Sequence, residues 1–142
     1  MADPRLFYDH RQARLTSLDE GALAGLRHRT VIDLTSGAAS LALWQEEHRP
    51  GFRVPLHLHD CEEIISVLRG RIEAEIGPAR FMVGPEQSIL IPAWRPHGFR
   101  VESEEPVLLL AIFSSSDPGI FRADGTPSIP PWRGGRSGHL ED

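Results

Sequence analysis

The sequence predicts an all-β domain, and three observations support that prediction. From about residue 30 onward, short apolar segments follow one another at close spacing, with Gly, Pro or charged clusters between them. The segment "RIEAEI" (71–76) alternates strictly, so Ile72, Ala74 and Ile76 share one face of a strand. The segment "VLLLAIF" (107–113) is apolar on both faces and is therefore expected to be covered on both sides.

The 142-residue chain has the length of one domain with one core, and we divide it into three parts. Residues 1–29 are expected to form an N-terminal arm with a short helix, because the capping box "SLDE" (17–20) precedes the apolar "ALAGL" (22–26). Gly21 and Gly25 weaken that helix. Residues 30–116 are expected to form the β-barrel. Residues 117–142 are rich in Pro and Gly and predict an irregular tail, with its last nine residues mobile.

The strands expected within the barrel are the successive apolar segments of residues 30–116. Turn signals, such as Ser36-Gly37 and "HRPGFR" (48–53), separate the first of them. In chain order, the expected strands are "TVIDL" (30–34), "ASLALWQEE" (39–47), "VPLHLH" (54–59), "EEIISVLRG" (62–70), "RIEAEIG" (71–77), "RFMVG" (80–84), "SILIP" (88–92), "HGFRVES" (97–103) and "VLLLAIF" (107–113).

Composition and charge argue against several function classes. The formal net charge of -5 disfavours a polyanionic partner, so no binding of nucleic acid is expected. No apolar run approaches the roughly 20 residues of a membrane-spanning helix, and the N-terminus lacks the pattern of a secretion signal. We therefore expect a cytoplasmic protein that does not bind membranes. The single Cys61 excludes a disulfide within the chain, and the absence of Lys excludes Schiff-base catalysis by a side chain.

Two histidines stand one residue apart in "PLHLHDCEEIISVLRG" (55–70), which suggests a metal site. In an extended strand His57 and His59 point to the same face, and Glu63 returns to that face if the chain stays extended. His97, at the start of a later strand, could supply a third imidazole. Imidazole suits Fe, Zn, Ni and Cu, and the carboxylate also admits Mn. The alternative is a set of core histidines with satisfied hydrogen bonds, although burying three imidazoles and a carboxylate without a cation would be costly.

The same segment resembles the first signature motif of the cupin superfamily. It reads Gly51, five residues, His57, one residue, His59, three residues, Glu63, six residues, Gly70, which agrees with the motif at every defined position. The second motif is matched in part, because Pro92 and His97 are correctly spaced. Where the family has two glycines and an asparagine, this chain has Glu86, Trp94 and Val101.

This resemblance implies a single-domain jelly-roll barrel of the double-stranded β-helix type. It also implies that His57, His59, Glu63 and His97 bind one divalent transition metal ion, either Fe, Mn, Ni, Zn or Cu. A tryptophan disfavours the positive φ that a glycine adopts. We therefore expect Trp94 to reshape the turn that presents His97, with its indole across the barrel mouth.

We favour a small metalloenzyme of the dioxygenase, isomerase or lyase type. Its substrate would be an oxygen-rich small molecule that chelates the ion, and Glu63 would serve as a ligand or as a catalytic base. The alternative is a cupin that binds a sugar or effector without catalysis, and a storage protein ranks last. The doubly apolar segment 107–113 and the resemblance together predict a homodimer.

Three further sets of residues have weaker signals. Cys61 shares the parity of the site residues, but a small buried residue is the simpler interpretation. Glu62 would replace Glu63 if the turn after His59 were tighter. Candidates for lining the cavity are Trp44, Gln45, Phe81, Met82, Trp94 and Phe99, and candidates for an anionic substrate are Arg53, Arg95 and Arg100.

Overall fold

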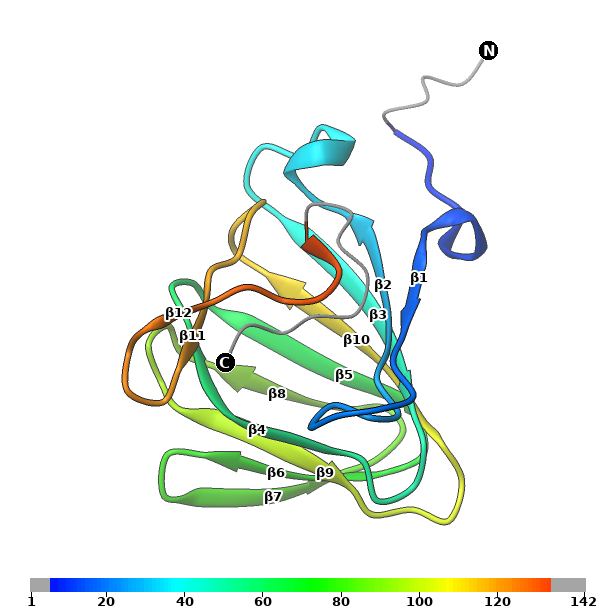
Figure 1. Cartoon of the computed structure of the whole chain (residues 1–142), viewed down its shortest axis with the longest axis vertical. Coiled ribbons are helices and arrows are strands. Elements are labelled where there is room, and N and C mark those ends of the chain that lie inside the picture. Colours follow the sequence, from blue (N-terminus) through cyan, green and yellow to red (C-terminus); the bar gives the residue numbers. More distant parts are fainter. Residues whose placement is uncertain (1–5, 134–142) are drawn as a thin grey trace.

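A computed structural model describes residues 6–133, which form two antiparallel sheets facing each other (Figure 1). The first sheet has the order β1-β2-β3-β10-β5-β8 and the second the order β12-β11-β4-β9-β6-β7. The strands are β1 (Leu15–Ser17), β2 (Arg27–Ile32), β3 (Ala42–His48), β4 (Arg53–His59), β5 (Glu63–Arg69), β6 (Ile72–Ile76), β7 (Ala79–Val83), β8 (Gln87–Ile91), β9 (His97–Val101), β10 (Val107–Phe113), β11 (Ile120–Arg122) and β12 (Pro127–Ser128). The predicted all-β jelly-roll is confirmed.

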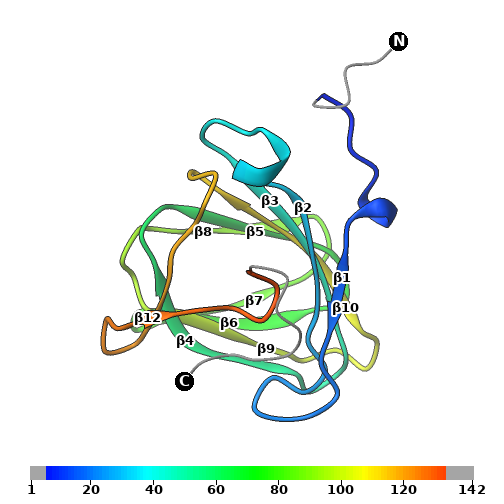
Figure 2. The same cartoon turned by 45° about the horizontal axis from the view of Figure 1, so that its top comes forward.

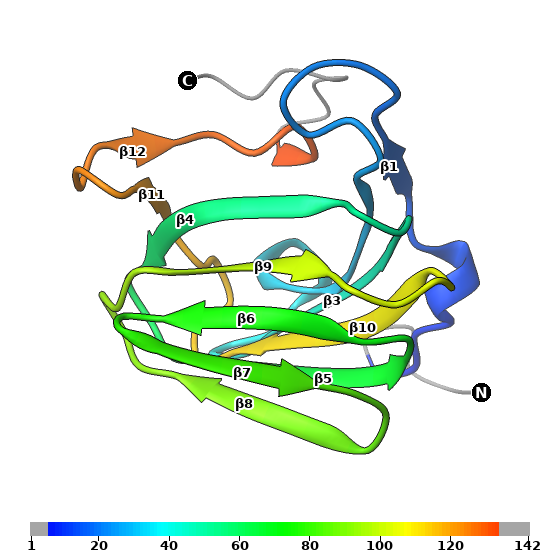
Figure 3. The same cartoon turned by 90° about the horizontal axis from the view of Figure 1, so that it is seen from below.

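The core lies between the two sheets, because each strand turns alternate side chains inward. In β6 the inward residues Ile72, Ala74 and Ile76 are buried, as the alternation of the sequence predicts. In β10 the burial alternates along the whole strand, and Val107 and Leu109 are among the inward residues. Each fully buried aliphatic side chain of this kind stabilises the fold by about 1.5–3 kcal/mol. Figure 3 shows the second sheet toward the viewer, with β4, β9, β6 and β7 side by side.

The helix predicted after the capping box is wrong. β1 ends at Ser17, and the chain then turns back to β2 through hydrogen bonds from Gly25 N to Leu18 O and from Leu18 N to Leu26 O. Gly21 and Gly25 have φ of 84° and 94°, which a right-handed helix cannot contain. Among the described residues, the helical segments are two short 3-10 turns, η1 (His10–Gln12) and η2 (Leu34–Ser36).

The tail is more ordered than its composition predicts. β11 pairs with β4 at the end that carries the two histidines, and β12 pairs with β11. The segment that follows β12 crosses over the opening of the barrel (Figure 2). The last nine residues, for which mobility is predicted, lie outside the described part of the chain.

Both glycine positions of the second motif have a left-handed backbone in this chain, although neither residue is a glycine. Glu86 and Trp94, which occupy the two glycine positions, have φ of 64° and 61°. The expectation that Trp94 reshapes the turn is therefore wrong, because the residue adopts the left-handed conformation instead. Its amide donates to His59 O at 2.7 Å, and its indole is 56% exposed and packs against Phe121. These contacts offset the roughly 1–2 kcal/mol by which the left-handed region is disfavoured.

Replacing Glu86 by glycine is expected to stabilise the protein. Glu86 is exposed and its φ is 64°, so glycine removes the unfavourable Cβ contact at little loss of packing. Glycine has a larger conformational entropy in the unfolded chain, which offsets part of this gain. The free energy of unfolding should therefore increase by about 0.5–1 kcal/mol. Thermal unfolding followed by circular dichroism should show a midpoint higher by about 2–6 °C. Glu86→Ala is the control, since alanine keeps the Cβ, and an equal gain in that variant would contradict the explanation.

Candidate metal site

Four side chains from three strands converge at one end of the barrel. His57 and His59 lie on β4, Glu63 begins β5 and His97 begins β9, and one ligand atom from each lies within 4.8 Å of the others. His57 is paired with His97 across the two strands. β9 approaches β4 closely because the next residue is glycine: a Cβ on Gly98 would lie 2.6 Å from Val54 O. The four predicted metal ligands are thus brought together.

The three imidazoles are oriented by the backbone. Each Nδ1–H donates to a carbonyl oxygen, from His57 to Pro55 at 2.9 Å, from His59 to Gly119 at 2.9 Å and from His97 to Arg95 at 2.8 Å. Because the proton of the neutral ring is used in this way, the Nε2 lone pairs remain for the centre of the cluster. Hydrogen bonds of this kind also set the ring orientation and raise the basicity of histidines that bind metals.

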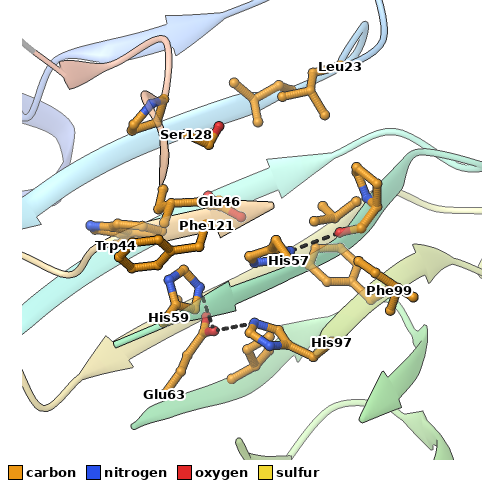
Figure 4. A pocket seen from close by; sticks show the side chains of 18 of the residues that line it. Leu23, Trp44, Glu46, His57, His59, Glu63, His97, Phe99, Phe121 and Ser128 are labelled. Carbon is orange, nitrogen blue, oxygen red and sulfur yellow. Dashed lines mark hydrogen bonds and ion pairs between the residues drawn. The ribbon is translucent and has the colours of Figure 1, made fainter. Parts of the chain in front are cut away.

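Glu63 is the negative charge at the centre of the cluster. Its Oε1 lies 3.2 Å from His59 Nε2 and 3.1 Å from His97 Nε2 (Figure 4). Burial alone would raise the pKa of Glu63, but the hydrogen bonds from His59 and His97 outweigh it and lower this pKa to about 2. Burial alone would lower the pKa of His59, but the hydrogen bond to Glu63 outweighs it and raises this pKa above 6.5.

These contacts have a direct consequence for a cation. The rings of His59 and His97 already donate their Nδ1–H to carbonyls. A hydrogen between Nε2 and the Glu63 carboxylate therefore has to be a second proton on the ring. A metal ion can take the place of that proton between the imidazole nitrogens and the carboxylate. His57 is different, because burial and the neighbouring His97 and His59 lower its pKa to about 3 and keep the ring neutral. A neutral imidazole is the form that binds metal.

The cluster forms part of the wall of a cavity of about 320 Å³ inside the barrel (Figure 4). Most of the other lining residues are apolar, and they include Trp44, Phe99, Phe121 and Trp132. The tail contributes to this wall through β11, β12 and the residues that follow. The cavity is large enough for one small ring system, which would contact the cluster at one end.

The predictions for the cavity lining, the arginines and Glu62 are confirmed only in part. Trp44 and Phe99 line the cavity as predicted, whereas Gln45, Phe81, Met82 and Trp94 are not among its lining residues. None of the three candidate arginines is among them either, and Arg100 instead lies close to the carboxylates of Glu73 and Glu102. Glu62 is exposed while Glu63 is 5% exposed, so the alternative with Glu62 is wrong.

Cys61 does not join the cluster. It is buried against Ala42, Trp44, Ala111 and Phe113. Burial and the nearby carboxylates raise the pKa of its thiol to about 11, which keeps it protonated and unreactive. The simpler interpretation of a small core residue therefore agrees with its surroundings.

Sequence reasoning missed two parts of the cavity. The first is the set of backbone carbonyls that hold the imidazoles, among which Gly119 O comes from the tail, and a carbonyl has no signal in the sequence. The second is a buried network of Glu46 with His28 and His48, together with Trp132 stacked on His28. The alternation in "ALWQEEH" (42–48) places Trp44, Glu46 and His48 on one face and could have indicated this network.

Comparisons with known proteins agree with this architecture. The family described as "Cupin domain" matches residues 44–113. Auxin-binding protein T92 of Nicotiana tabacum is 27% identical over 113 residues, which cover 71% of this chain and 60% of that protein. The polyketide synthase CurC of Streptomyces cyaneus is 33% identical over 86 residues, which cover 60% of this chain and 53% of that protein. The chain thus spans somewhat more than half of the length of these relatives.

Among solved structures, the polyketide cyclase RemF from Streptomyces resistomycificus superposes with a TM-score of 0.68. It is 24% identical, and the match covers 81% of this chain and 82% of that one. This likeness concerns the fold. In the described residues, no helix is long and apolar enough to cross a membrane.

Replacing Glu63 by glutamine is expected to lower the pKa of His59. In the metal-free protein the Glu63 charge holds that pKa above 6.5 against the effect of burial, so without the charge it should fall below 6.5. The pairing of protonated His59 with Glu63 stabilises the fold at pH values below the raised pKa of His59, and this stabilisation is lost as the pH rises through it. Histidine ring signals followed by NMR against pH would measure the change.

The matched control is Glu62→Gln, one residue away and exposed. It should leave the titration of His59 unchanged. A His59 pKa that stays above 6.5 in Glu63→Gln would contradict the proposed pairing.

Proposed function

We propose that this chain, which belongs to the cupin superfamily, is a metalloenzyme that binds one divalent transition metal ion through His57, His59, Glu63 and His97. The observation that supports this most is the orientation of the three imidazoles. Each donates its Nδ1–H to a carbonyl, and the Nε2 atoms of His59 and His97 lie 3.2 and 3.1 Å from the buried carboxylate of Glu63. Three nitrogens and one oxygen suit Fe, Zn, Ni, Cu or Mn.

The proposed substrate is a small, oxygen-rich molecule with a ring or polyketide-like skeleton. The aromatic wall formed by Trp44, Phe99, Phe121 and Trp132 suits such a skeleton. The name of the relative CurC, a polyketide synthase, also supports this class. The bound ion would polarise a carbonyl or enol oxygen of the substrate as a Lewis acid. The mostly apolar wall would limit the access of water to that oxygen.

Glu63 is the proposed catalytic base as well as a ligand. In the metal-free protein, hydrogen bonds from His59 and His97 lower the pKa of Glu63 to about 2, which makes it a weak base. In the metal-loaded protein a bound ion would replace these contacts and keep the carboxylate ionised as a ligand. Release of Glu63 from the ion on substrate binding would leave a buried carboxylate, and burial would then raise its pKa toward the range useful for proton transfer.

The second candidate function is binding without catalysis. It is supported by relatives that are named auxin-binding proteins, among them one that matches 71% of this chain. The same cavity and the same ion would then hold a small ligand reversibly. Tight binding with no product would distinguish this function from the first.

The metal prediction is tested with protein purified without chelators or a polyhistidine tag. Mass spectrometry should find about one transition metal ion per chain in the wild type. His57→Ala removes one of four ligands and should lower the affinity more than about 100-fold, since even changes outside the ligand shell lower it 10–100-fold. His10→Ala is the matched control, because His10 is not a lining residue of the cavity and should not affect the metal content.

Catalysis is tested on the metal-loaded protein with diketones, flavonols, keto-uronates and linear polyketide analogues. Product formation that is lost after chelation and in His57→Ala would support the enzyme. Protein without metal, even after reconstitution, would overturn the metal site and with it the proposed enzyme.

We also propose that the protein is a homodimer that pairs through the outer face of the first sheet. The outer row in register across β2, β3, β10, β5 and β8 consists of aliphatic residues, namely Ile32, Leu43, Ile112, Ile64 and Leu90. Leu90 is 57% exposed and Ile64 is 38% exposed. A continuous apolar row of this kind is typical of an interface, and a two-fold axis would bring the same row of a second copy onto it.

Leu90→Glu is expected to weaken this dimer, because it places a charge in the apolar row. Size-exclusion chromatography with light scattering should give a dimer mass for the wild type and a shift toward the monomer for the variant. Leu34→Glu is the control, since Leu34 is equally exposed at 57% but lies in η2 outside the row. A monomer mass for the wild type would contradict the proposal.

A further inference from the structure

Glu46 is a second buried carboxylate on the wall of the cavity, apart from the candidate metal site. It lies on β3, two residues beyond Trp44, and it is 8% exposed. Glu46 and the cluster both belong to the lining of one cavity (Figure 4). Among the described lining residues, Glu46 is the one acidic group outside the cluster. The proposed function leaves this carboxylate without a role.

Two fully buried histidines hold Glu46 in place. Its Oε2 lies 2.8 Å from His28 Nδ1, and its Oε1 lies 3.0 Å from His48 Nε2. The backbone N–H of Arg27 donates to His48 Nδ1 at 3.3 Å, so in the neutral ring the proton of His48 is on Nε2 and points at Glu46. The other nitrogen of His28 lies 2.7 Å from the hydroxyl of Thr30, which can donate or accept.

The carboxylate retains free acceptor capacity. Each oxygen of an ionised carboxylate can accept about two hydrogen bonds, and the two histidines use one on each. Burial alone would raise the pKa of Glu46, but the hydrogen bonds from His28 and His48 outweigh it and lower this pKa. Burial lowers the pKa of His28, which keeps that ring neutral. The group is therefore a permanent acceptor and a weak base, because an effective base needs a pKa near the working pH.

The surroundings of Glu46 are aromatic. The ring of Trp132 stacks on His28 with centroids 3.6 Å apart, and Trp44 contacts the same imidazole edge to face at 4.9 Å. Trp44 also faces His59 of the cluster, with centroids 6.2 Å apart. The indole of Trp44 therefore stands between the two polar parts of the wall, and a ligand that touches both has to extend along one aromatic ring.

From this arrangement we infer that Glu46 determines specificity by accepting a hydrogen bond from a hydroxyl or N–H group of the ligand. The ligand class is then a molecule with oxygen atoms at one end and a separate donor, such as a phenol, at the other. A ligand with a carboxylate in place of this donor would be repelled by the charge of Glu46. The inference rests on the proposed function for the end of the ligand that contacts the cluster, while the contact at Glu46 follows from the cavity itself.

Glu46→Gln is a suitable variant because the network can accommodate it. The amide oxygen can accept from His48, whose proton position is unchanged. The amide NH₂ can donate to His28 Nδ1 if the proton of that ring moves to Nε2 and is donated to Thr30. The variant therefore keeps shape and hydrogen bonds and removes the charge. Its unfolding midpoint and zinc content serve as controls for folding and for the cluster.

The probes are 4-fluorophenol and 4-fluoroanisole, which differ in having and lacking a donor. Their binding to metal-free and zinc-loaded protein is measured by ¹⁹F NMR. Because a hydrogen bond to a charged group contributes a factor of about 10 to 100, the wild type should prefer the phenol by at least about tenfold. In Glu46→Gln that preference should fall to within about threefold, since a neutral acceptor is weaker.

An equal preference in both proteins, or no preference in the wild type, would overturn the inference. If the variant does not fold, the wild type still provides a test through the ring ¹⁵N signals of His28 and His48. These should shift with the phenol and not with the anisole, and the absence of such a difference would also overturn it. Failure to take up zinc would count against the proposed function alone, because the phenol preference is measured without metal as well.

Discussion

The burial of one carboxylate among three imidazoles is the constraint on which the site depends. An unpaired charge in that position would be strongly destabilising, and the protein compensates Glu63 with His59 and His97 at 3.1–3.2 Å. The orientation of those rings depends in turn on carbonyls from three separate segments. The tail is one of them, because Gly119 O accepts from His59 while β11 extends the sheet beside β4. Ordering of the tail and orientation of the site are therefore coupled.

The cavity wall has two buried carboxylates, and both are held by histidine pairs. Glu63 is compensated by His59 and His97, and Glu46 by His28 and His48. The difference lies in the proton positions. The Nδ1 atom of His48 accepts a hydrogen bond from a backbone N–H, so its proton is on Nε2. In His59 and His97, by contrast, Nδ1 carries the proton and donates it to a carbonyl. Glu46 thus receives its hydrogen bond from a neutral ring, while Glu63 requires a proton or a metal ion between it and the rings.

Much of this could be predicted from the sequence because it depends on local periodicity and spacing. The one-residue gap between His57 and His59 and the alternation in 71–76 assign faces directly. The predicted helix after Ser17 failed because a capping box is a weak local signal, and Gly21 and Gly25 with positive φ favour a turn between paired strands. The tail was underestimated because β11 and β12 are short and become strands only through pairing, β11 with β4 and β12 with β11. Trp94 was misjudged because the hydrogen bond from its backbone N–H to His59 O and its contact with Phe121 offset an unfavourable φ.

The sequence by itself determined the strand-rich fold, the four converging side chains and the cupin resemblance, since these follow from alternation and fixed spacing along the chain. Only the tertiary structure decided which carbonyls orient the imidazoles, which aromatic residues form the cavity and how Glu46 lies between His28 and His48. These features join residues far apart in the chain, such as His59 with Gly119 and His28 with Trp132. The physical reason is that backbone acceptors and cavity walls arise from packing between sheets and tail, and no local pattern of residues encodes that packing.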